Sequence, residues 1–415
     1  MNRSMLALLP VLFLLWLVPS PSHAASKANV EKQYQTWLQN DLWPDAKKLG
    51  VSKKNFKRAF SGITLNWKLP DLVPPGTKPP KKQGQSQAEF RAPSAYFSEK
   101  NLQSQAASGR ALLGKWRKTL NGIERKYGVP GHILIAIWGR ESGFGRARLP
   151  YSALRVLSTK AFMSTRKELF RRETLAALQI IQRGDVSAKN MKSSWAGAMG
   201  QPQFLPSSFL DYAVDFDGDG RANIWTSVPD TLASIANYLA KFGWQKGRDW
   251  GFEVRIPDAM SCAQEGPDRA QKINKWAKSG IKRISGKDFP AKEKRADGMM
   301  LVPAGRTGPH FIVTPNFYTL KKYNNSDLYA LFVGNLGDRI AYGGGAFKAR
   351  WGQQPKMLRS GIARMQRALE KQGHDVGGAD GLPGFKTRRS IGAWQTKQGR
   401  QSTCFPTPAL IKSIQ

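Results

Sequence analysis

One stretch, residues 133–146 with the sequence ILIAIWGRESGFGR, constrains the fold of this chain more than any other. Its first six residues are all apolar, so a helix through them has no polar face and belongs in a protein interior. Pro130 suits the first turn of such a helix, and Gly143 and Gly145 suit its end. The pattern predicts a buried helix that carries Glu141 in its last turn.

Glu141 has two interpretations at this point. Burial and the negative end of the helix dipole both raise the pKa of a carboxyl group, and an acid that stays protonated near neutral pH can act as a general acid. Alternatively, Glu141 caps the helix and pairs with Arg140 or Arg146. Structural ion pairs are commoner than catalytic acids, so the stretch by itself favours the second interpretation.

The N-terminus has the three parts of a secretory signal peptide. Arg3 provides the positive start, residues 5–18 form an apolar run, and Ser22-His23-Ala24 is a small-x-small cleavage site. The run is short for a bilayer span, so we predict cleavage after Ala24, with an uncleaved membrane anchor as the alternative. No cysteine follows the run closely, so a lipoprotein anchor is not indicated.

An excess of basic residues limits the classes of partner. The chain has 65 Lys and Arg against 29 Asp and Glu, a formal net charge of +36. In a cytosolic protein this balance would suggest nucleic acid, but an exported chain meets cell-wall polyanions or an anionic membrane surface instead. We therefore predict no nucleic-acid partner, and peripheral association with the wall or the membrane.

The two cysteines, Cys262 and Cys404, lie far apart in the sequence. They could pair in an oxidising compartment, although two cysteines in a chain of this length do not make a disulfide scaffold. The sequence leaves both a disulfide and two free thiols open.

Hydrophobic periodicity predicts a mainly helical α+β protein with a small β-containing part. Helical spacing covers residues 30–60, 106–127, 149–183, 231–242 and 327–340, and Ser326 suits the N-cap of the last helix. Short apolar or alternating runs predict strands at residues 252–256, 299–302 and 311–313.

A glycine-rich boundary separates off the C-terminus. Glycines occupy positions 343–345, and residues 352–355 read GQQP. Two further helices are expected beyond them, at residues 358–372 and 387–397, with apolar positions that suit a small helical core. The mature chain is long enough for about two domains.

An acidic loop begins at residue 215. Three alternating aspartates followed by Gly220 and Asn223 match positions one, three, five, six and nine of an EF-hand loop. Position twelve is Thr226 rather than the usual Glu, so either a weak structural Ca²⁺ site or a hydrated turn is consistent with the pattern. The candidate ligands are Asp215, Asp217, Asp219, Arg221 and Asp230.

Residues 194–204, SWAGAMGQPQF, contain no titratable side chain and cannot supply an acid or a base. Their small residues allow a polymer to approach closely, while Ser194 and Gln203 offer neutral hydrogen bonds. Trp195 and Phe204 offer faces for stacking. This composition favours a sugar-binding groove, with a tightly packed turn as the alternative.

Other kinds of site find no support. The 4 histidines, at positions 23, 132, 310 and 374, are dispersed and suggest no metal cluster. No Ser/His/Asp grouping, phosphate-binding loop or dinucleotide fingerprint is convincing.

Together these residues resemble the membrane-bound lytic transglycosylase B family of bacterial murein lytic transglycosylases, over most of the mature chain. Three motifs in the order and spacing of that family carry the resemblance. They are Gly139-Arg140-Glu141-Ser142-Gly143-Phe144-Gly145, then Ser194-Trp195-Ala196-Gly197-Ala198-Met199-Gly200 with Gln203-Phe204 and Pro206-Ser207, and finally Tyr323-Asn324 before Ser326 and Tyr329-Ala330.

The resemblance implies a lysozyme-like fold and a periplasmic enzyme that cleaves the β-1,4 bond from N-acetylmuramic acid to N-acetylglucosamine without adding water. It makes Glu141 the sole catalytic carboxyl, which would first protonate the glycosidic oxygen. The same group would then deprotonate the C6 hydroxyl of muramic acid, giving a 1,6-anhydro product. No cofactor is required, and some members carry an EF-hand-like Ca²⁺ site where the acidic loop falls.

The resemblance also implies binding residues and domains. The implied contacts with peptidoglycan glycan strands are Ser194, Met199, Gln203, Tyr323, Asn324, Tyr96 and Arg166. The C-terminal piece looks like a three-helix peptidoglycan-binding domain, on Met365-Gln366, Gly373, Asp380-Gly381, Gly384, Thr387 and Trp394-Gln395. We therefore expect a signal peptide at residues 1–24, a catalytic domain at 25–350 and a peptidoglycan-binding domain at 355–415.

Two alternatives stay open. A muramidase of the same fold would usually need a second carboxylate about 5–9.5 Å from the first, and the sequence cannot place Asp185 or Asp211 relative to Glu141. A non-enzymatic wall-binding protein is the other. The sequence gives no indication of the oligomeric state.

Overall fold

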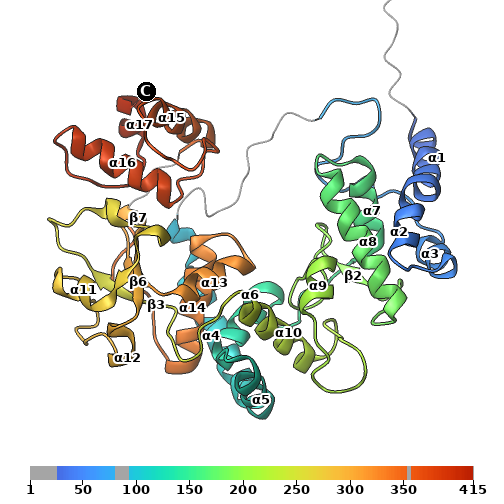
Figure 1. Ribbon diagram of the computed structural model, residues 1–415, viewed down its shortest axis with the longest axis horizontal. Coiled ribbons are helices and arrows are strands. Elements are labelled where there is room, and N and C mark those ends of the chain that lie inside the picture. Colours follow the sequence, from blue (N-terminus) through green and yellow to red (C-terminus); the bar gives the residue numbers. More distant parts are fainter. Residues whose placement is uncertain (1–25, 80–92, 353–356, 415) are drawn as a thin grey trace, which may run out of the picture.

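The protein is described by a computed structural model over residues 26–79, 93–352 and 357–414 (Figure 1). Helices predominate, and a five-stranded antiparallel sheet stands at one side of them. The predicted mainly helical α+β class is therefore confirmed. The predicted signal peptide lies outside the described residues. Among the helices that are described, none is long and apolar enough to cross a membrane.

A first hydrophobic core surrounds α6 (Gly131–Ser142), the helix predicted from the apolar run, and residues 133–138 are all buried in it. The helices around it are α4 (Glu99–Lys115), α5 (Arg117–Tyr127), α10 (Val228–Lys241), α13 (Pro315–Tyr323) and α14 (Asp327–Tyr342). The helix predicted at 106–127 is in fact two, because the backbone leaves the helical region at Trp116, with φ −99° and ψ 16°.

A second hydrophobic core lies beyond α10, on the other side of the molecule from the sheet (Figure 1). Its helices are α1 (Lys27–Trp37), the π-helical turn η1 (Leu38–Leu42), α2 (Trp43–Lys48), α3 (Lys53–Phe60), α7 (Ala153–Met163), α8 (Lys167–Arg183) and α9 (Pro206–Tyr212). A short ladder joins β1 (Tyr151–Ser152) to β2 (Lys192–Ser193) beside them. Tyr323 and Tyr238 pack against both cores, so the end of α13 lies where the two meet.

The small β-containing part is a sheet in the order β4-β6-β8-β3-β5. The strands are β3 (Gly251–Arg255), β4 (Gln271–Lys272), β5 (Lys282–Arg283), β6 (Asp297–Leu301) and β8 (His310–Val313), with β7 (Pro303–Arg306) outside that order. All three predicted strands are confirmed, as β3, β6 and β8. Ile312 of β8 faces Phe252 on one side and Met300 on the other, which places β8 at the centre.

Short helices accompany the sheet and precede α4. They are α11 (Ile273–Lys278), α12 (Ala291–Lys294) and the 3-10 turns η3 (Pro93–Tyr96), η4 (Cys262–Gln264) and η5 (Pro267–Arg269). Trp276 of α11 donates a hydrogen bond from its indole nitrogen to the carbonyl of Gly298 in β6, at 2.9 Å. This bond fastens α11 to the sheet that it covers.

The C-terminal unit, residues 357–414, has a hydrophobic core of its own. It contains the two predicted helices, as α15 (Arg359–Lys371) and α16 (Phe385–Lys397), and a third, α17 (Pro408–Ile414). Ile362, Leu369 and Ile391 are buried between these helices. The unit sits over the edge of the sheet rather than over the second core (Figure 1).

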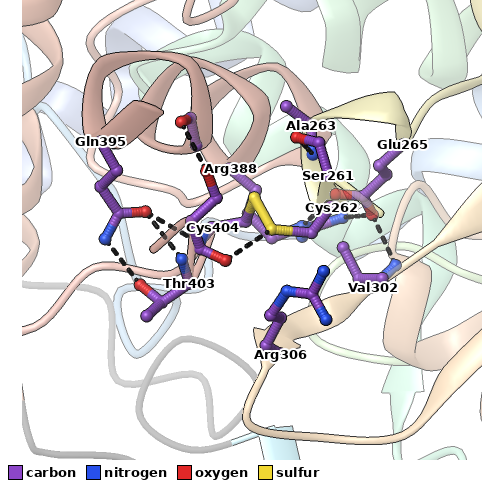
Figure 2. Close-up of a disulfide and its surroundings, with 12 residues drawn as sticks. Ser261, Cys262, Ala263, Glu265, Val302, Arg306, Arg388, Gln395, Thr403 and Cys404 are labelled. Carbon is purple, nitrogen blue, oxygen red and sulfur yellow. Dashed lines mark hydrogen bonds and ion pairs between the residues drawn. A yellow bond between two sulfur atoms is a disulfide. The ribbon is translucent and has the colours of Figure 1, made fainter. Parts of the chain in front are cut away.

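A disulfide between Cys262 and Cys404 fastens this unit to the sheet (Figure 2). Cys262 lies on η4, beside the sheet, and Cys404 follows α16. The backbone N–H of Arg306 also donates to the carbonyl of Thr403, at 3.0 Å. Of the two alternatives that the sequence left open, the paired form is the one present.

Removing the disulfide is expected to weaken the attachment of the C-terminal unit. The bridge closes a loop of 142 residues, and cross-links over long loops restrict the unfolded chain most. We expect Cys262→Ser/Cys404→Ser to lower the free energy of unfolding by about 2–4 kcal/mol. Urea unfolding of the oxidised protein and of the double variant measures this difference. An unchanged midpoint would contradict it.

Candidate active site

Glu141 lies in the last turn of α6, as the sequence predicts. The helix ends at Gly143, whose backbone is left-handed with φ 57° and ψ 40°, a conformation that favours glycine. The N–H of Gly143 donates to the carbonyl of Gly139, at 3.0 Å. This termination leaves the carboxyl at the end of a buried helix, where two other helices reach it.

A tyrosine holds the carboxyl of Glu141. Tyr329 of α14 donates a hydrogen bond of 2.6 Å from its hydroxyl to Oε1 of Glu141. Burial raises the pKa of Glu141 above its ordinary value, although the Tyr329 hydrogen bond and the Arg140 cation act in the opposite direction. The carboxyl is therefore biased toward the protonated form that a general acid requires.

The structural interpretation of Glu141 predicted an ion pair with Arg140 or Arg146. Arg140 instead donates a hydrogen bond to the hydroxyl of Tyr96, at 2.7 Å, and lies over the ring of Phe332 at 5.0 Å. Arg146 donates to the carbonyl of Gly143, at 2.9 Å. Among the described ion pairs none includes Glu141.

A second tyrosine lies parallel to the first. The rings of Tyr323 and Tyr329 stack with their centroids 6.4 Å apart and an angle of 6° between their planes. The hydroxyl of Tyr323 donates to the carbonyl of Pro202, at 2.7 Å. Burial, and next the negative charge of Glu141, raise the pKa of both phenols well above the ordinary value. Both tyrosines therefore stay neutral hydrogen-bond donors.

Residues 194–204 form a compact turn beside these tyrosines. Met199 and Phe204 exchange backbone hydrogen bonds of 2.7 and 3.1 Å, and Met199 is fully buried. The Ser194 hydroxyl accepts the N–H of Ala198 at 3.2 Å, so it shapes the turn itself. Gln203 has a left-handed backbone, with φ 56°, and its amide donates to the carbonyl of Gly200. Three predicted contacts lie in this turn, Ser194, Met199 and Gln203. Of these, Gln203 directly follows Pro202, whose carbonyl accepts the Tyr323 hydroxyl.

The remaining predicted contacts are Tyr96, Asn324 and Arg166. Tyr96 reaches the site through its hydrogen bond with Arg140. Asn324 follows Tyr323 directly, at the end of α13. Arg166 precedes α8 in the second core, where its guanidinium lies over Phe170 at 5.3 Å. The described interactions do not join Arg166 to Glu141.

Asp185 and Asp211, the two carboxylates considered from the sequence, form no described hydrogen bond or ion pair with Glu141. Asp185 forms an ion pair with Arg183, at 3.0 Å, and Asp211 is exposed.

The acidic loop brings three of its predicted ligands together. Carboxylate oxygens of Asp215, Asp217 and Asp230 all lie within 4.8 Å of one another. Asp230 is fully buried, and its Oδ2 accepts the N–H of Asn223 at 2.8 Å. Asp219 lies outside this cluster. Its carboxylate accepts the backbone N–H of Arg221, the other predicted ligand, at 2.9 Å. Three carboxylate oxygens at this spacing fit a hard cation that takes oxygen ligands.

Tyr329 contacts Glu141 but was not among the site residues predicted from the sequence. Its side chain is 1% exposed, and a buried phenol needs a partner for its hydroxyl. The signal was a tyrosine within the apolar run of residues 328–334, three residues after the Ser326 N-cap, which accepts the Tyr329 N–H at 3.2 Å.

The family model described as "Transglycosylase SLT domain" matches residues 33–338. Among curated proteins, the chain is 31% identical to membrane-bound lytic murein transglycosylase B of Escherichia coli (strain K12), over 275 residues. That match covers 66% of this chain and 73% of the relative.

Solved structures of related proteins share the fold. SltB3 from Pseudomonas aeruginosa was solved with NAG-anhNAM-pentapeptide and with NAG-NAM-pentapeptide. It matches with TM-scores of 0.80 and 0.82 at 35% and 37% identity, over 92% of this chain and 99% of SltB3. Escherichia coli Slt35, solved with calcium, matches with a TM-score of 0.52 at 26% identity, over 76% of this chain and 93% of Slt35. These likenesses confirm the predicted lysozyme-like fold.

Proposed function

The chain belongs to the transglycosylase SLT domain family and is a lytic transglycosylase of peptidoglycan, and on that premise we propose that Glu141 alone performs its acid and base steps. One observation supports this best. Glu141 is a carboxyl whose pKa burial raises, and it accepts a hydrogen bond from a neutral tyrosine. A single group in that state can give a proton and later take one.

The proposed reaction has two proton transfers. Glu141 gives its proton to the glycosidic oxygen as the bond from that oxygen to C1 of N-acetylmuramic acid breaks. The C6 hydroxyl of the same sugar then attacks C1 and loses its proton to the Glu141 carboxylate. The product is a 1,6-anhydro ring, water is not consumed, and Glu141 ends protonated as it began.

Tyr329 and Tyr323 have supporting parts in this scheme. Tyr329 donates to Oε1 of Glu141, so its hydrogen bond strengthens as negative charge develops there between the two transfers. Tyr323 lies against Tyr329 and reaches the turn at Pro202, which connects Glu141 to the proposed binding surface. A neutral donor suits this role, because a charged one would keep Glu141 ionised from the start.

The proposed substrate is the glycan strand of peptidoglycan. SltB3, one of the relatives of known structure, was solved with NAG-anhNAM-pentapeptide and with NAG-NAM-pentapeptide. For this chain the proposed contacts remain Ser194, Met199, Gln203, Tyr323, Asn324, Tyr96 and Arg166. Because Ser194 and Met199 serve the turn itself, we expect them to act mainly by shaping it.

Mass analysis of digested sacculi tests the proposed chemistry. We expect products that end in 1,6-anhydro-N-acetylmuramic acid. Reducing-end muramic acid, which is 18 Da heavier by the added water, would instead indicate a muramidase of the same fold.

Two proposals concern the rest of the chain. We propose that residues 355–415 bind peptidoglycan and that residues 25–350 form the catalytic domain, with the net positive charge of the chain helping to hold the enzyme on the wall. Export by a signal peptide at residues 1–24 would place it in the periplasm, and the Escherichia coli relative is named as membrane-bound.

A structural Ca²⁺ is proposed at the acidic loop, where Asp215, Asp217 and Asp230 would supply carboxylate oxygens. With a dissociation constant of about 10⁻⁴–10⁻³ M, 5 mM Ca²⁺ should stabilise the protein by about 1–2 kcal/mol relative to EGTA. Thermal unfolding measures this. Asp217→Asn should remove the difference, while Asp211→Asn, outside the cluster, should keep it. Equal midpoints with Ca²⁺ and EGTA would exclude the site.

A further inference from the structure

A buried ionic cluster joins the C-terminal unit to the catalytic helices. Arg388 of α16 contacts Glu265 at 2.6 Å and Asp327 at 3.0 Å, and Lys321 contacts the other oxygen of Asp327 at 2.6 Å. The side chains of Arg388 and Glu265 are 4% and 0% exposed. Figure 2 shows both residues beside the Cys262–Cys404 disulfide.

The members of this cluster come from three parts of the chain. Glu265 follows η4 beside the sheet, Arg388 lies on the C-terminal helix α16, and Asp327 is the first residue of α14. The disulfide and the Glu265 contact fix Arg388 from the side of the sheet. The ion pair with Asp327 joins the C-terminal unit to the start of α14.

That contact falls inside the segment that carries the two tyrosines of the site. Lys321 precedes Tyr323 by two residues, and Asp327 precedes Tyr329 by two. Tyr323 and Tyr329 are the stacked pair, and Tyr329 holds Glu141. A displacement of Asp327 would thus move the start of α14 and the hydroxyl that meets the catalytic carboxyl.

A cleft separates part of this segment from the C-terminal unit, so the ionic contacts are important in holding the two together. A cleft of about 380 Å³ lies between the segment and the C-terminal unit, lined on one side by Asn325, Asp327 and Leu328 and on the other by Val376 and Phe385. Leu328 and Tyr329 pack into the first core on the other side of this segment. Toward the C-terminal unit, directed contacts between charged groups position it, because the forked guanidinium fixes their geometry.

The chemistry of the cluster points the same way. A buried ion pair adds little net stability compared with apolar packing, since both charges lose their hydration. What it does provide is a defined geometry. Although burial raises the pKa of Asp327, the Lys321 and Arg388 cations lower it to about 2, so Asp327 stays charged at every pH at which the enzyme would work.

We infer that Arg388 of the C-terminal unit is a positioning residue for the active site, acting through Asp327 on the segment that presents Tyr323 and Tyr329 to Glu141. This inference rests on the proposed role of Glu141. It assigns the C-terminal unit a part in the reaction itself, in addition to any part in holding the wall.

The test compares Arg388→Met with Arg389→Met in the full-length oxidised protein. Arg389 is the matched control, because it is the next residue of α16 and pairs across the same boundary with Asp268, at 2.9 Å. On a soluble glycan fragment we expect Arg388→Met to lower kcat by about 10–100-fold with little change in KM, through misplacement of catalytic groups. Arg389→Met should leave kcat unchanged.

The pH profile separates positioning from general damage. Glu141 faces Tyr329 of α14 and Tyr323 of α13, with Arg140 beside it on α6. Loss of the Tyr329 bond would raise the pKa of Glu141, so the basic limb of kcat should move to higher pH in Arg388→Met. Asp327→Asn, which keeps the size of the side chain, should also move the basic limb of kcat to higher pH. This variant replaces Arg388→Met in the test if Arg388→Met does not fold.

Coupling completes the test. If Arg388 acts through the Tyr329–Glu141 hydrogen bond, the double variant Arg388→Met/Tyr329→Phe should shift the basic limb of the kcat profile no further than Tyr329→Phe alone. A normal kcat and pH profile in folded Arg388→Met, or additive shifts in the double variant, would overturn the inference. Activity retained by Glu141→Gln would instead overturn the proposed role of Glu141, whatever the Arg388 variants do.

Discussion

Glu141→Gln is expected to lower kcat by about 10³–10⁴-fold, the upper part of the range for a lost general acid or base. The amide keeps the size of the side chain and can still accept the Tyr329 hydrogen bond, but it cannot give a proton to the glycosidic oxygen. Both proposed transfers use this one carboxyl, so no other described group takes over the second step. Release of soluble muropeptides from sacculi measures the loss.

Controls keep this result specific. Thermal unfolding should show Glu141→Gln folded, and it should be at least as stable as the parent at neutral pH, because the parent has to desolvate a carboxyl at the same position. Asp185→Asn removes a carboxyl that pairs with Arg183 and should keep full activity. Substantial lysis by Glu141→Gln, or inactivity of Asp185→Asn, would show that the acid is misassigned.

Tyr329→Phe should have the second largest effect. The change removes one hydroxyl and the hydrogen bond that it donates to Glu141, at 2.6 Å. A hydrogen bond to a charged group contributes about 1.5–3 kcal/mol, so kcat should fall by about 10–100-fold as the Glu141 carboxylate loses its donor. Kinetics on a soluble glycan fragment measure this fall.

The pH dependence of Tyr329→Phe has a definite sign. The Tyr329 bond lowers the pKa of Glu141, so its removal raises that pKa further. The acid must be protonated at the start of the reaction, and activity is lost as pH rises through its pKa. The basic limb should therefore move to higher pH while the maximal rate falls. Tyr342→Phe, an exposed position on the same helix, is the control that should change neither. A limb that stays in place would count against the Tyr329 contact.

The helices and strands followed mostly from local signals in the sequence. Six successive apolar residues specified a helix buried on every side, and Gly143 specified where it ends. Alternation predicted β3, and short apolar runs predicted β6 and β8. One continuous helix was predicted through Trp116, whereas the structure has a break there between α4 and α5. The prediction missed the break because the hydrophobic periodicity continues from α4 into α5. Such patterns record which face of each element is apolar, and they do so within a few turns.

The acidic loop and the 194–204 turn were predicted only in part. Alternation pointed to Asp215 and Asp217, and the tertiary structure adds buried Asp230 to them while Asp219 turns to a backbone N–H. Ser194 has the hydroxyl expected of a binding residue, yet that hydroxyl accepts backbone N–H groups of its own turn. Residue type indicates what a side chain can bind. Which partner it takes depends on the backbone conformation around it.

The sequence by itself determined the buried helix, the acid at its end and the family to which the chain belongs. Only the tertiary structure decided that Tyr329, 188 residues away, holds Glu141, and that Cys262 and Cys404 pair. It also decided that Arg388 reaches the start of α14. The physical reason is range. Periodicity and capping act between neighbours along the chain, whereas these contacts depend on how separate helices pack, and no local pattern records that packing.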